Sequence, residues 1–154
     1  MRKFSAVVLA TLSTIPVQAQ TGLLDRPTAR FFSSEGNVAF LVAGTLVKSP
    51  RTRAGAVVTS TLLVTGLKYL TKERRPDGTT HDSFPSGHAM AAFTVAGLAA
   101  AQARTKTEAG LWYLGAALIA DSRVTLKRHY PHDVLIGGLL GLLVARTPSL
   151  QLRF

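Results

Sequence analysis

Apolar residues are gathered into five stretches beyond residue 20, at about residues 37–47, 54–70, 88–103, 111–120 and 134–145. Each stretch fits a helix. Prolines stand at the edges of these stretches, where they are expected to start or stop helices; they are Pro27, Pro50, Pro76, Pro85, Pro131 and Pro148. The pattern predicts an all-α helical bundle of about five to six helices.

The N-terminal segment is a further apolar run with a layout of its own. Arg2 and Lys3 open it, an apolar stretch follows, and small residues end at a possible cleavage point after Ala19. This arrangement is typical of a secretory signal. The alternative is a first membrane helix that is retained. We therefore divide the chain into residues 1–19, a signal peptide or first membrane helix, and residues 20–154, a single domain.

Composition and loop charges predict that the bundle is embedded in a membrane. Hydrophobic residues make up 47% of the chain and charged residues 17%, with a mean hydropathy of +0.23, which is high for an ordinary soluble enzyme. Most stretches are shorter than the roughly 20 residues that cross a bilayer upright, so a soluble exported bundle is the alternative. Alternate connections are basic, as expected for cytoplasmic loops; their basic residues are Lys48, Arg51, Arg53, Arg104, Lys106, Arg146 and Arg153. The other connections would then face outward, although the one from Lys68 to Arg75 is itself basic.

The net charge and the absence of cysteine limit the chemistry. The formal charge is +10, which suits an anionic partner such as a phosphorylated substrate, an anionic lipid or nucleic acid. Nucleic acid is disfavoured, because the basic residues are not interleaved with aromatic residues along a polar stripe. The sequence has no cysteine, which excludes disulfides, thiolate nucleophiles and cysteine-ligated metal sites.

Three short segments carry the candidate chemistry, and all three adjoin ends of the apolar stretches. They are Lys68 followed after six residues by Arg75-Pro76; Pro85-Ser86-Gly87-His88; and Ser122-Arg123 followed after five residues by His129 and after three more by Asp133. Together they resemble the three-part signature of the type 2 phosphatidic acid phosphatase (PAP2) superfamily at every specified position. The resemblance covers roughly residues 54–145.

The third segment can also be interpreted from its own residues. Pro131 suits the first turn of a helix, which places Asp133 near the N-terminal end of that helix and His129 just before it. A carboxylate there can bind the imidazole Nδ1–H and leave Nε2 free as a nucleophile. Taken alone, a histidine and an aspartate at these positions are more typical of a helix cap.

The second segment also precedes an apolar helix. Ser86 is a suitable N-cap, Gly87 lets the backbone approach a ligand closely, and free amides at a helix start bind phosphate oxygens. His88 follows at a position from which it could protonate a leaving oxygen. Three cations, Lys68, Arg75 and Arg123, could surround a transferring phosphoryl group.

The resemblance to the PAP2 superfamily implies a role for each residue. It implies that His129 attacks phosphorus, that Asp133 orients His129, and that His88 protonates the leaving group and then activates water. These roles predict a bell-shaped pH–rate profile. The implied phosphate ligands are Lys68, Arg75, Ser86, Gly87, Ser122 and Arg123, with Ser122 as a phosphate or backbone contact.

The resemblance further implies a metal-independent phosphatase without a cofactor, acting on a lipid phosphate or diphosphate at a membrane. Candidate substrates are phosphatidic acid, phosphatidylglycerol phosphate, isoprenyl diphosphate and a lipid A phosphate. The expected location is the bacterial inner membrane with the site facing the periplasm, or the periplasm itself for a soluble exported non-specific acid phosphatase. The short connection between Pro76 and Pro85 resembles that of compact membrane members.

Three other functions are weighed against this prediction. A metal site could use histidine and carboxylate ligands from the set His81, Asp82, His88, His129, His132 and Asp133; we expect His81 and His132 instead to be exposed loop or helix-start residues. A vanadium-dependent haloperoxidase would share the three-part pattern but is typically much larger. A non-enzymatic protein whose basic loops bind anionic lipid would not need the two histidines and Asp133 together.

Overall fold

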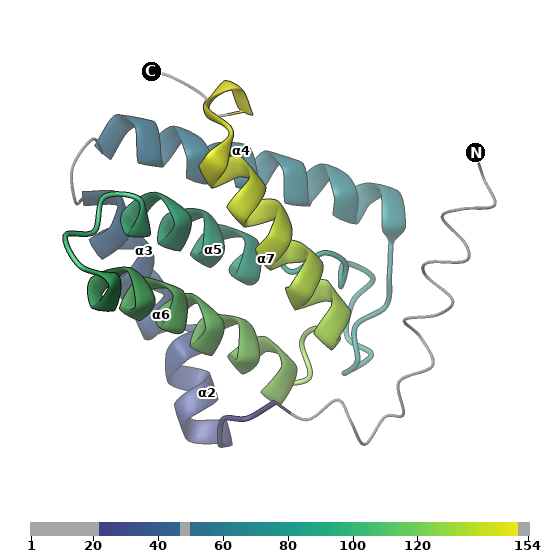
Figure 1. The fold of residues 1–154 in the computed structure, drawn as a ribbon. Helices are drawn as coiled ribbons and strands as arrows, with labels where there is room; N and C mark the ends of the chain where they lie inside the picture. The colour runs from purple at the N-terminus through teal and green to yellow at the C-terminus, as the bar shows by residue number, and fades with distance from the viewer. Residues whose placement is uncertain (1–21, 47–49, 151–154) are drawn as a thin grey trace.

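The computed structural model describes residues 22–46 and 50–150, and within these ranges the regular structure is helical throughout. The predicted all-α bundle is confirmed (Figure 1). The N-terminal segment 1–19, for which we predicted a signal or a membrane helix, lies outside the described residues. The helices are α2 (Arg26–Ser33), α3 (Glu35–Leu46), α4 (Pro50–Thr71), α5 (Gly87–Ala100), α6 (Lys106–Thr125) and α7 (Pro131–Arg146), followed by the 3₁₀ helix η2 (Pro148–Leu150).

Five of these helices, α3 to α7, correspond to the five apolar stretches. Helix α6 is longer than its stretch because Thr105 caps its start, where its hydroxyl accepts from the Glu108 N–H at 3.1 Å, and because Ser122 and Arg123 form its last turns. Helix α2 has no counterpart among the predicted stretches. Arginines Arg26 and Arg30 interrupt its apolar residues, so the segment lacks a continuous apolar run.

Helix α5 is the centre of the bundle. It packs against α3, α4, α6 and α7, and eight of its residues are buried, four of them alanines. Glycines bring α7 close to it. A Cβ atom on Gly141 would stand 2.3 Å from the Met90 carbonyl oxygen, and one on Gly137 would stand 2.5 Å from that of Ser86. Small residues therefore set the spacing between α5 and α7, as they do where helix backbones approach closely.

Polar side chains link helices α4, α5 and α7 in the interior. The hydroxyls of Ser60 on α4 and Thr94 on α5 are 2.7 Å apart, and the Thr94 hydroxyl lies 3.2 Å from the Gly141 carbonyl oxygen on α7. Both side chains are buried. Because each hydroxyl has a partner, the core carries these polar groups without the cost of an unmade hydrogen bond.

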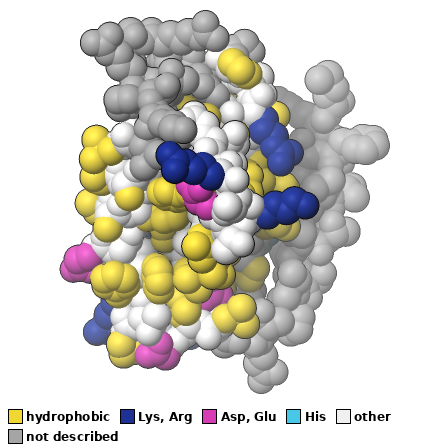
Figure 2. Space-filling view, turned by 60° about the vertical axis from the view of Figure 1, so that its left-hand side comes forward, with side chains coloured by type: hydrophobic (Ala, Val, Ile, Leu, Met, Phe, Trp, Pro, Cys, Tyr) yellow, Lys and Arg dark blue, Asp and Glu magenta, His cyan; other side chains and the backbone are white. Residues whose placement is uncertain are grey.

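The outer surface is unusually apolar. Figure 2 shows apolar side chains at the surface of one side of the molecule, among few charged ones. Large apolar residues at least 40% exposed occur on five α-helices: Phe31 on α2; Val38, Val42 and Leu46 on α3; Val58, Leu62, Leu63, Tyr69 and Leu70 on α4; Leu111 and Leu114 on α6; Leu135, Leu139 and Leu143 on α7. Within the described residues, one helical segment, Ala54–Thr71 of α4, is long and apolar enough to cross a membrane.

The antiparallel course of α4 to α7 gathers the three motifs at one end of the bundle, toward the right of Figure 1. The structure places most of the motif residues in the terminal turns of these helices. Lys68 and Arg123 lie in last turns, while His88 and Asp133 lie in first turns. Backbone direction at a helix end is fixed, so side chains there are held more firmly than on a loop.

Candidate active site

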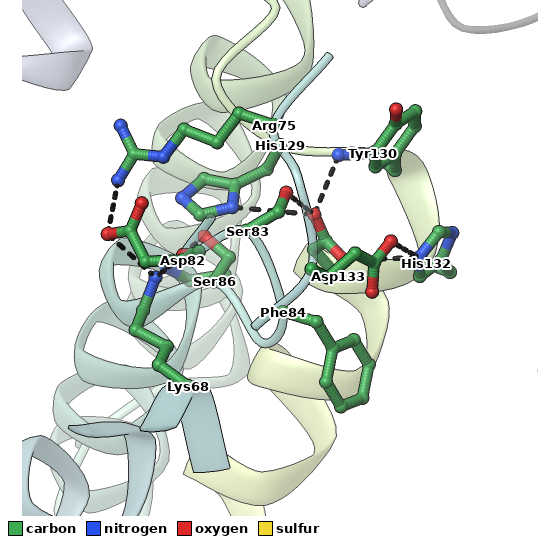
Figure 3. A network of polar contacts seen from close by, with 12 residues as sticks. Lys68, Arg75, Asp82, Ser83, Phe84, Ser86, His129, Tyr130, His132 and Asp133 are labelled. Carbon is green, nitrogen blue, oxygen red and sulfur yellow. Dashed lines mark hydrogen bonds and ion pairs between the residues drawn. The ribbon is translucent and has the colours of Figure 1, made fainter. Parts of the chain in front are cut away.

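His129 and Asp133 meet at the start of α7. His129 lies in the connection between α6 and α7, where its N–H donates to the Arg123 carbonyl oxygen at 3.2 Å. Its ring nitrogen Nδ1 is 3.5 Å from Asp133 Oδ2, and the two side chains are 2% and 0% exposed (Figure 3). This is a long contact rather than a formed hydrogen bond, and a small ring movement closes it. The contact directs Nδ1 toward the carboxylate.

The Asp133 carboxylate is surrounded by donors. Oδ2 accepts hydrogen bonds from the Ser83 hydroxyl and from the Tyr130 N–H, the latter at 2.8 Å. Although burial is the largest single influence and raises the pKa of Asp133, contacts with His129, His132 and Ser83 outweigh it and hold the pKa well below its usual range. Asp133 is therefore ionised at every physiological pH.

Burial lowers the pKa of His129, whereas it raises that of Asp133, because in each case it disfavours the charged form. Loss of solvent lowers the pKa of His129 below that of a free imidazole, more than the carboxylate of Asp133 raises it, and the positive charges of Lys68 and Arg123 lower it further. A neutral imidazole with Nδ1 turned to a carboxylate leaves Nε2 with its lone pair available. His129 thus has the protonation state of a nucleophile.

Lys68 and Arg75 share one carboxylate. Arg75 Nη2 is 2.9 Å from Asp82 Oδ2, and Lys68 Nζ is 3.7 Å from the same oxygen and donates to the Asp82 carbonyl (Figure 3). Asp82 is the more exposed partner, at 44% of its side chain against 18% for each cation. Two of the predicted phosphate ligands are therefore together, held by an acidic residue whose part in the site the sequence did not reveal.

Arg123 differs from them because it has no acidic partner within ion-pair distance among the described residues. It is only 8% exposed, and its guanidinium donates to the hydroxyl of Ser33 on α2. Burial, then the nearby Arg75 and Arg128, lowers the pKa of Arg123 to about 10. A buried charge without a counter-ion is costly. The Nε–H groups of Arg123 and Arg75 are also buried without a partner, so the site presents unused donors.

Two serines and a glycine of the motifs have local contacts. The Ser86 hydroxyl accepts from the Ala89 N–H at 3.5 Å and caps α5, while the Ser86 N–H donates to the Asp133 carbonyl oxygen at 3.0 Å, joining motifs two and three. The Ser122 hydroxyl donates to the Ile119 carbonyl oxygen at 2.6 Å, so its contact is with backbone. A Cβ on Gly87 would meet only Val64, at 3.6 Å, so protein packing alone does not require glycine there.

His88, in the first turn of α5, faces both the cations and an apolar groove. Burial, then the positive charge of Arg123, lowers the pKa of His88 to about 4, whereas the Ser33 carbonyl raises it. The predicted protonated His88 is therefore disfavoured in the phosphate-free protein. The groove has a volume of about 640 Å³. Besides His88, it is lined by residues of α2, of α3 and of the connection between them: Ser33, Ser34, Glu35, Asn37, Val38, Ala39 and Val42.

Sequence reasoning missed several residues at this site. Ser33, Glu73, Asp82 and Ser83 contact the predicted residues, and His132 is not the exposed helix-start residue we expected. Its side chain is 13% exposed and its Nε2 lies between Glu73 and Asp133. Their only signal in the sequence is that they lie near the motifs. Each of these residues except Ser33 lies within two positions of a motif residue or between the first motif and the second.

The sequence profile of the PAP2 superfamily matches residues 50–152, which is most of the chain and includes all three motifs. The chain belongs to the PAP2 superfamily. Among PAP2 relatives, the lipid A 1-phosphatase of Porphyromonas gingivalis is 37% identical over 84 residues, an alignment that covers 53% of this chain and 19% of that protein. The match thus spans about a fifth of that relative.

The fold is also that of a solved structure. The crystal structure of Aquifex aeolicus LpxE superposes with a TM-score of 0.66 at 21% sequence identity, over 90% of this chain and 89% of that one. The family and the helical fold predicted from the sequence are confirmed. The predicted enzyme class, a phosphatase, is also that of the named relative.

Proposed function

We propose that this protein is a metal-independent phosphatase that hydrolyses the phosphate or diphosphate group of a lipid through a phosphohistidine on His129. The observation that carries the proposal is Arg123, a cation 8% exposed with no carboxylate partner among the described residues. Its unpaired Nε–H and that of Arg75 add buried donors beside the nucleophile. A phosphoryl group would supply the missing anion and accept these hydrogen bonds.

In the first step, Nε2 of His129 attacks phosphorus and a P–N bond forms as the bond from phosphorus to the leaving oxygen breaks. His88 gives its proton to that oxygen. The imidazolium character that develops on His129 is stabilised by the ionised Asp133 beside Nδ1. The cations Lys68, Arg75 and Arg123 balance the charge on the phosphoryl oxygens.

In the second step, neutral His88 takes a proton from water and the resulting hydroxide attacks phosphorus. The P–N bond breaks, inorganic phosphate leaves, and both histidines return to their starting states. His88 therefore acts first as acid and then as base. Burial, and after it nearby positive charge, lowers the pKa of His88 in the free protein. We infer that the arriving phosphate, which offsets the positive charge, loads His88 with its proton.

The lipid nature of the substrate is supported by the molecular surface and by the relative. Five α-helices expose large apolar side chains, and one segment of α4 is long and apolar enough to span a bilayer. The named relative is a lipid A 1-phosphatase. We therefore place a lipid A phosphate first among candidate substrates, ahead of isoprenyl diphosphate, phosphatidic acid and phosphatidylglycerol phosphate. The proposed location is the bacterial inner membrane, with the motif end of the bundle facing the periplasm.

The test is phosphate release from lipid A, isoprenyl diphosphate and phosphatidic acid by the full chain in detergent with excess EDTA. We expect the wild type to release phosphate and His129→Gln to be slower by at least about a thousandfold, because the nucleophile is lost. His81→Gln, an exposed histidine of the connection before α5, is the matched control. Loss of wild-type activity in EDTA, or an active His129→Gln, would refute the proposal.

A further inference from the structure

Glu73 and His132 form a cluster with Asp133 behind the nucleophile, and neither Glu73 nor His132 takes part in the two steps above. His132 Nε2 is 3.0 Å from Glu73 Oε1, with hydrogen-bond geometry, and 3.1 Å from Asp133 Oδ1. The other oxygen of Asp133, Oδ2, is the one near His129. One imidazole therefore bridges two carboxylates, one of which belongs to the candidate catalytic pair.

The ring of His132 is held firmly in this position. It stacks on Tyr130, with ring centroids 5.4 Å apart and planes 6° from parallel, and lies 6.1 Å from the ring of Phe84 (Figure 3). The backbone of Glu73 is held as well, because its carbonyl oxygen accepts from the Ser83 N–H at 2.8 Å. A ring packed in this way cannot turn away without breaking several contacts.

The cluster is chemically suited to a charged imidazole. Contact with the carboxylate of Asp133 and then with that of Glu73 raises the pKa of His132 to about 9. A cation at Nε2 attracts Oδ1 of Asp133 while Ser83 and Tyr130 bind Oδ2. With both oxygens engaged, the carboxylate plane is fixed toward His129.

We propose that His132, anchored by Glu73, is a positioning residue that fixes the Asp133 carboxylate against Nδ1 of His129 and moderates the negative charge that His129 experiences. This inference rests on the proposed function only for its effect on turnover. The arrangement itself, and its electrostatic effect on His129, exist without substrate.

Neutral replacements of His132 and of Glu73 should shift the pKa of His129 in opposite directions. Besides Asp133, the charged and titratable groups around His129 are Lys68 from α4, Arg123 from α6, His88 from α5 and the nearby Arg75. Replacing His132 by a neutral residue removes a positive charge, so the negative field at His129 grows and the pKa of His129 rises. Replacing Glu73 by a neutral residue removes a negative charge while Asp133 still keeps His132 protonated, so the pKa of His129 falls.

The experiment is a titration of the His129 imidazole by ¹⁵N NMR in the full chain in detergent, with the signal assigned through His129→Gln. We compare the wild type with His132→Gln, which keeps a neutral donor, and with Glu73→Gln; His81→Gln is the control. We expect shifts in opposite directions, each of about half a pKa unit or more, and no shift in the control. Shifts of the same sign, or none in either variant, would overturn the proposal.

Two further readouts separate positioning from other roles. In turnover assays we expect His132→Gln to lower kcat about tenfold with KM nearly unchanged, and the acid limb of its pH profile to move to higher pH. A variant that lowers only thermal stability, with wild-type kcat and profile, would show a structural role and overturn the proposal. A His132 signal that changes when EDTA is added would assign the cluster to a metal and overturn it too. Failure of wild-type turnover would count against the proposed function alone, because the titration needs no substrate.

Discussion

Replacing Arg123 by methionine should make the protein more stable and less active at the same time. Arg123 is 8% exposed and has no acidic partner among the described residues, while its guanidinium donates to Ser33. Replacing a buried ion pair by well-packed apolar residues is neutral or stabilises proteins by about 1–4 kcal/mol, and a buried charge without a counter-ion lacks even the attraction that a pair supplies. Loss of the hydrogen bond to Ser33 costs about 1 kcal/mol. The net free energy of unfolding should therefore rise by up to about 3 kcal/mol, because methionine keeps the apolar stem.

The loss of activity follows from the same charge. A donor aimed at the charge that develops in the transition state contributes about 2.7–4 kcal/mol, which corresponds to a hundred- to thousandfold in rate. Inorganic phosphate should also stabilise the wild type, by about 2.7 kcal/mol at a hundred times its dissociation constant. The variant should show a much smaller stabilisation.

The assay combines denaturant unfolding in detergent, with and without phosphate, and phosphate-release kinetics. Arg128→Met is the matched control, since Arg128 lies in the same motif but is 45% exposed and paired with Asp77; an exposed pair contributes at most about 1 kcal/mol. An Arg123→Met protein that is less stable than the wild type, and that phosphate stabilises as strongly, would refute the idea that Arg123 is a buried cation reserved for an anion.

Two further predictions concern proton transfer and packing. The pH profile of kcat/KM should be bell-shaped, with its maximum below about pH 6.5, the pKa of a free imidazole. Activity needs a neutral His129 and a protonated His88, and in the free protein the pKa of both histidines is lowered, that of His88 to about 4. The alkaline limb of the kcat profile should lie at higher pH than that of kcat/KM, since bound phosphate raises the pKa of His88, and coincident alkaline limbs would contradict this. Gly141→Ala should lower the unfolding midpoint in detergent by the equivalent of about 1–3 kcal/mol, because its Cβ would stand 2.3 Å from the Met90 carbonyl oxygen. The control Gly110→Ala, with nothing within 4 Å of its Cβ, should be slightly stabilising, and equal effects would contradict the close packing of α5 and α7.

The sequence predicted the parts of the fold that depend on local signals. Apolar runs flanked by proline located α3 to α7, and the spacing of three motifs indicated the family. Helix α2 was missed because Arg26 and Arg30 break its apolar pattern, and its position depends on packing against α6. A short amphipathic helix gives no signal when only continuous apolar runs are sought.

The candidate site was predictable to the extent that its residues belong to motifs. Contacts between residues that are distant in sequence could not be predicted. Asp82 reaches Lys68 across 14 positions and Glu73 reaches His132 across 59, and neither spacing follows from helix periodicity. The expectation that His132 is exposed was wrong because its ring is enclosed by Tyr130 and Phe84. The placement of basic loops on the cytoplasmic side stays a prediction, since Lys48 and Arg153 lie outside the described residues.

The central claim, a covalent intermediate on His129, is tested most directly by trapping it. The full chain carrying His88→Asn, in which the base for the second step is absent, is mixed with lipid substrate labelled in the phosphate group, quenched in alkali and digested. The account predicts label on the peptide that contains His129, stable in alkali and lost in acid as expected for an N–P bond, and no label in His129→Gln. Label on a serine or aspartate, or turnover in the wild type without any labelled protein, would contradict the account.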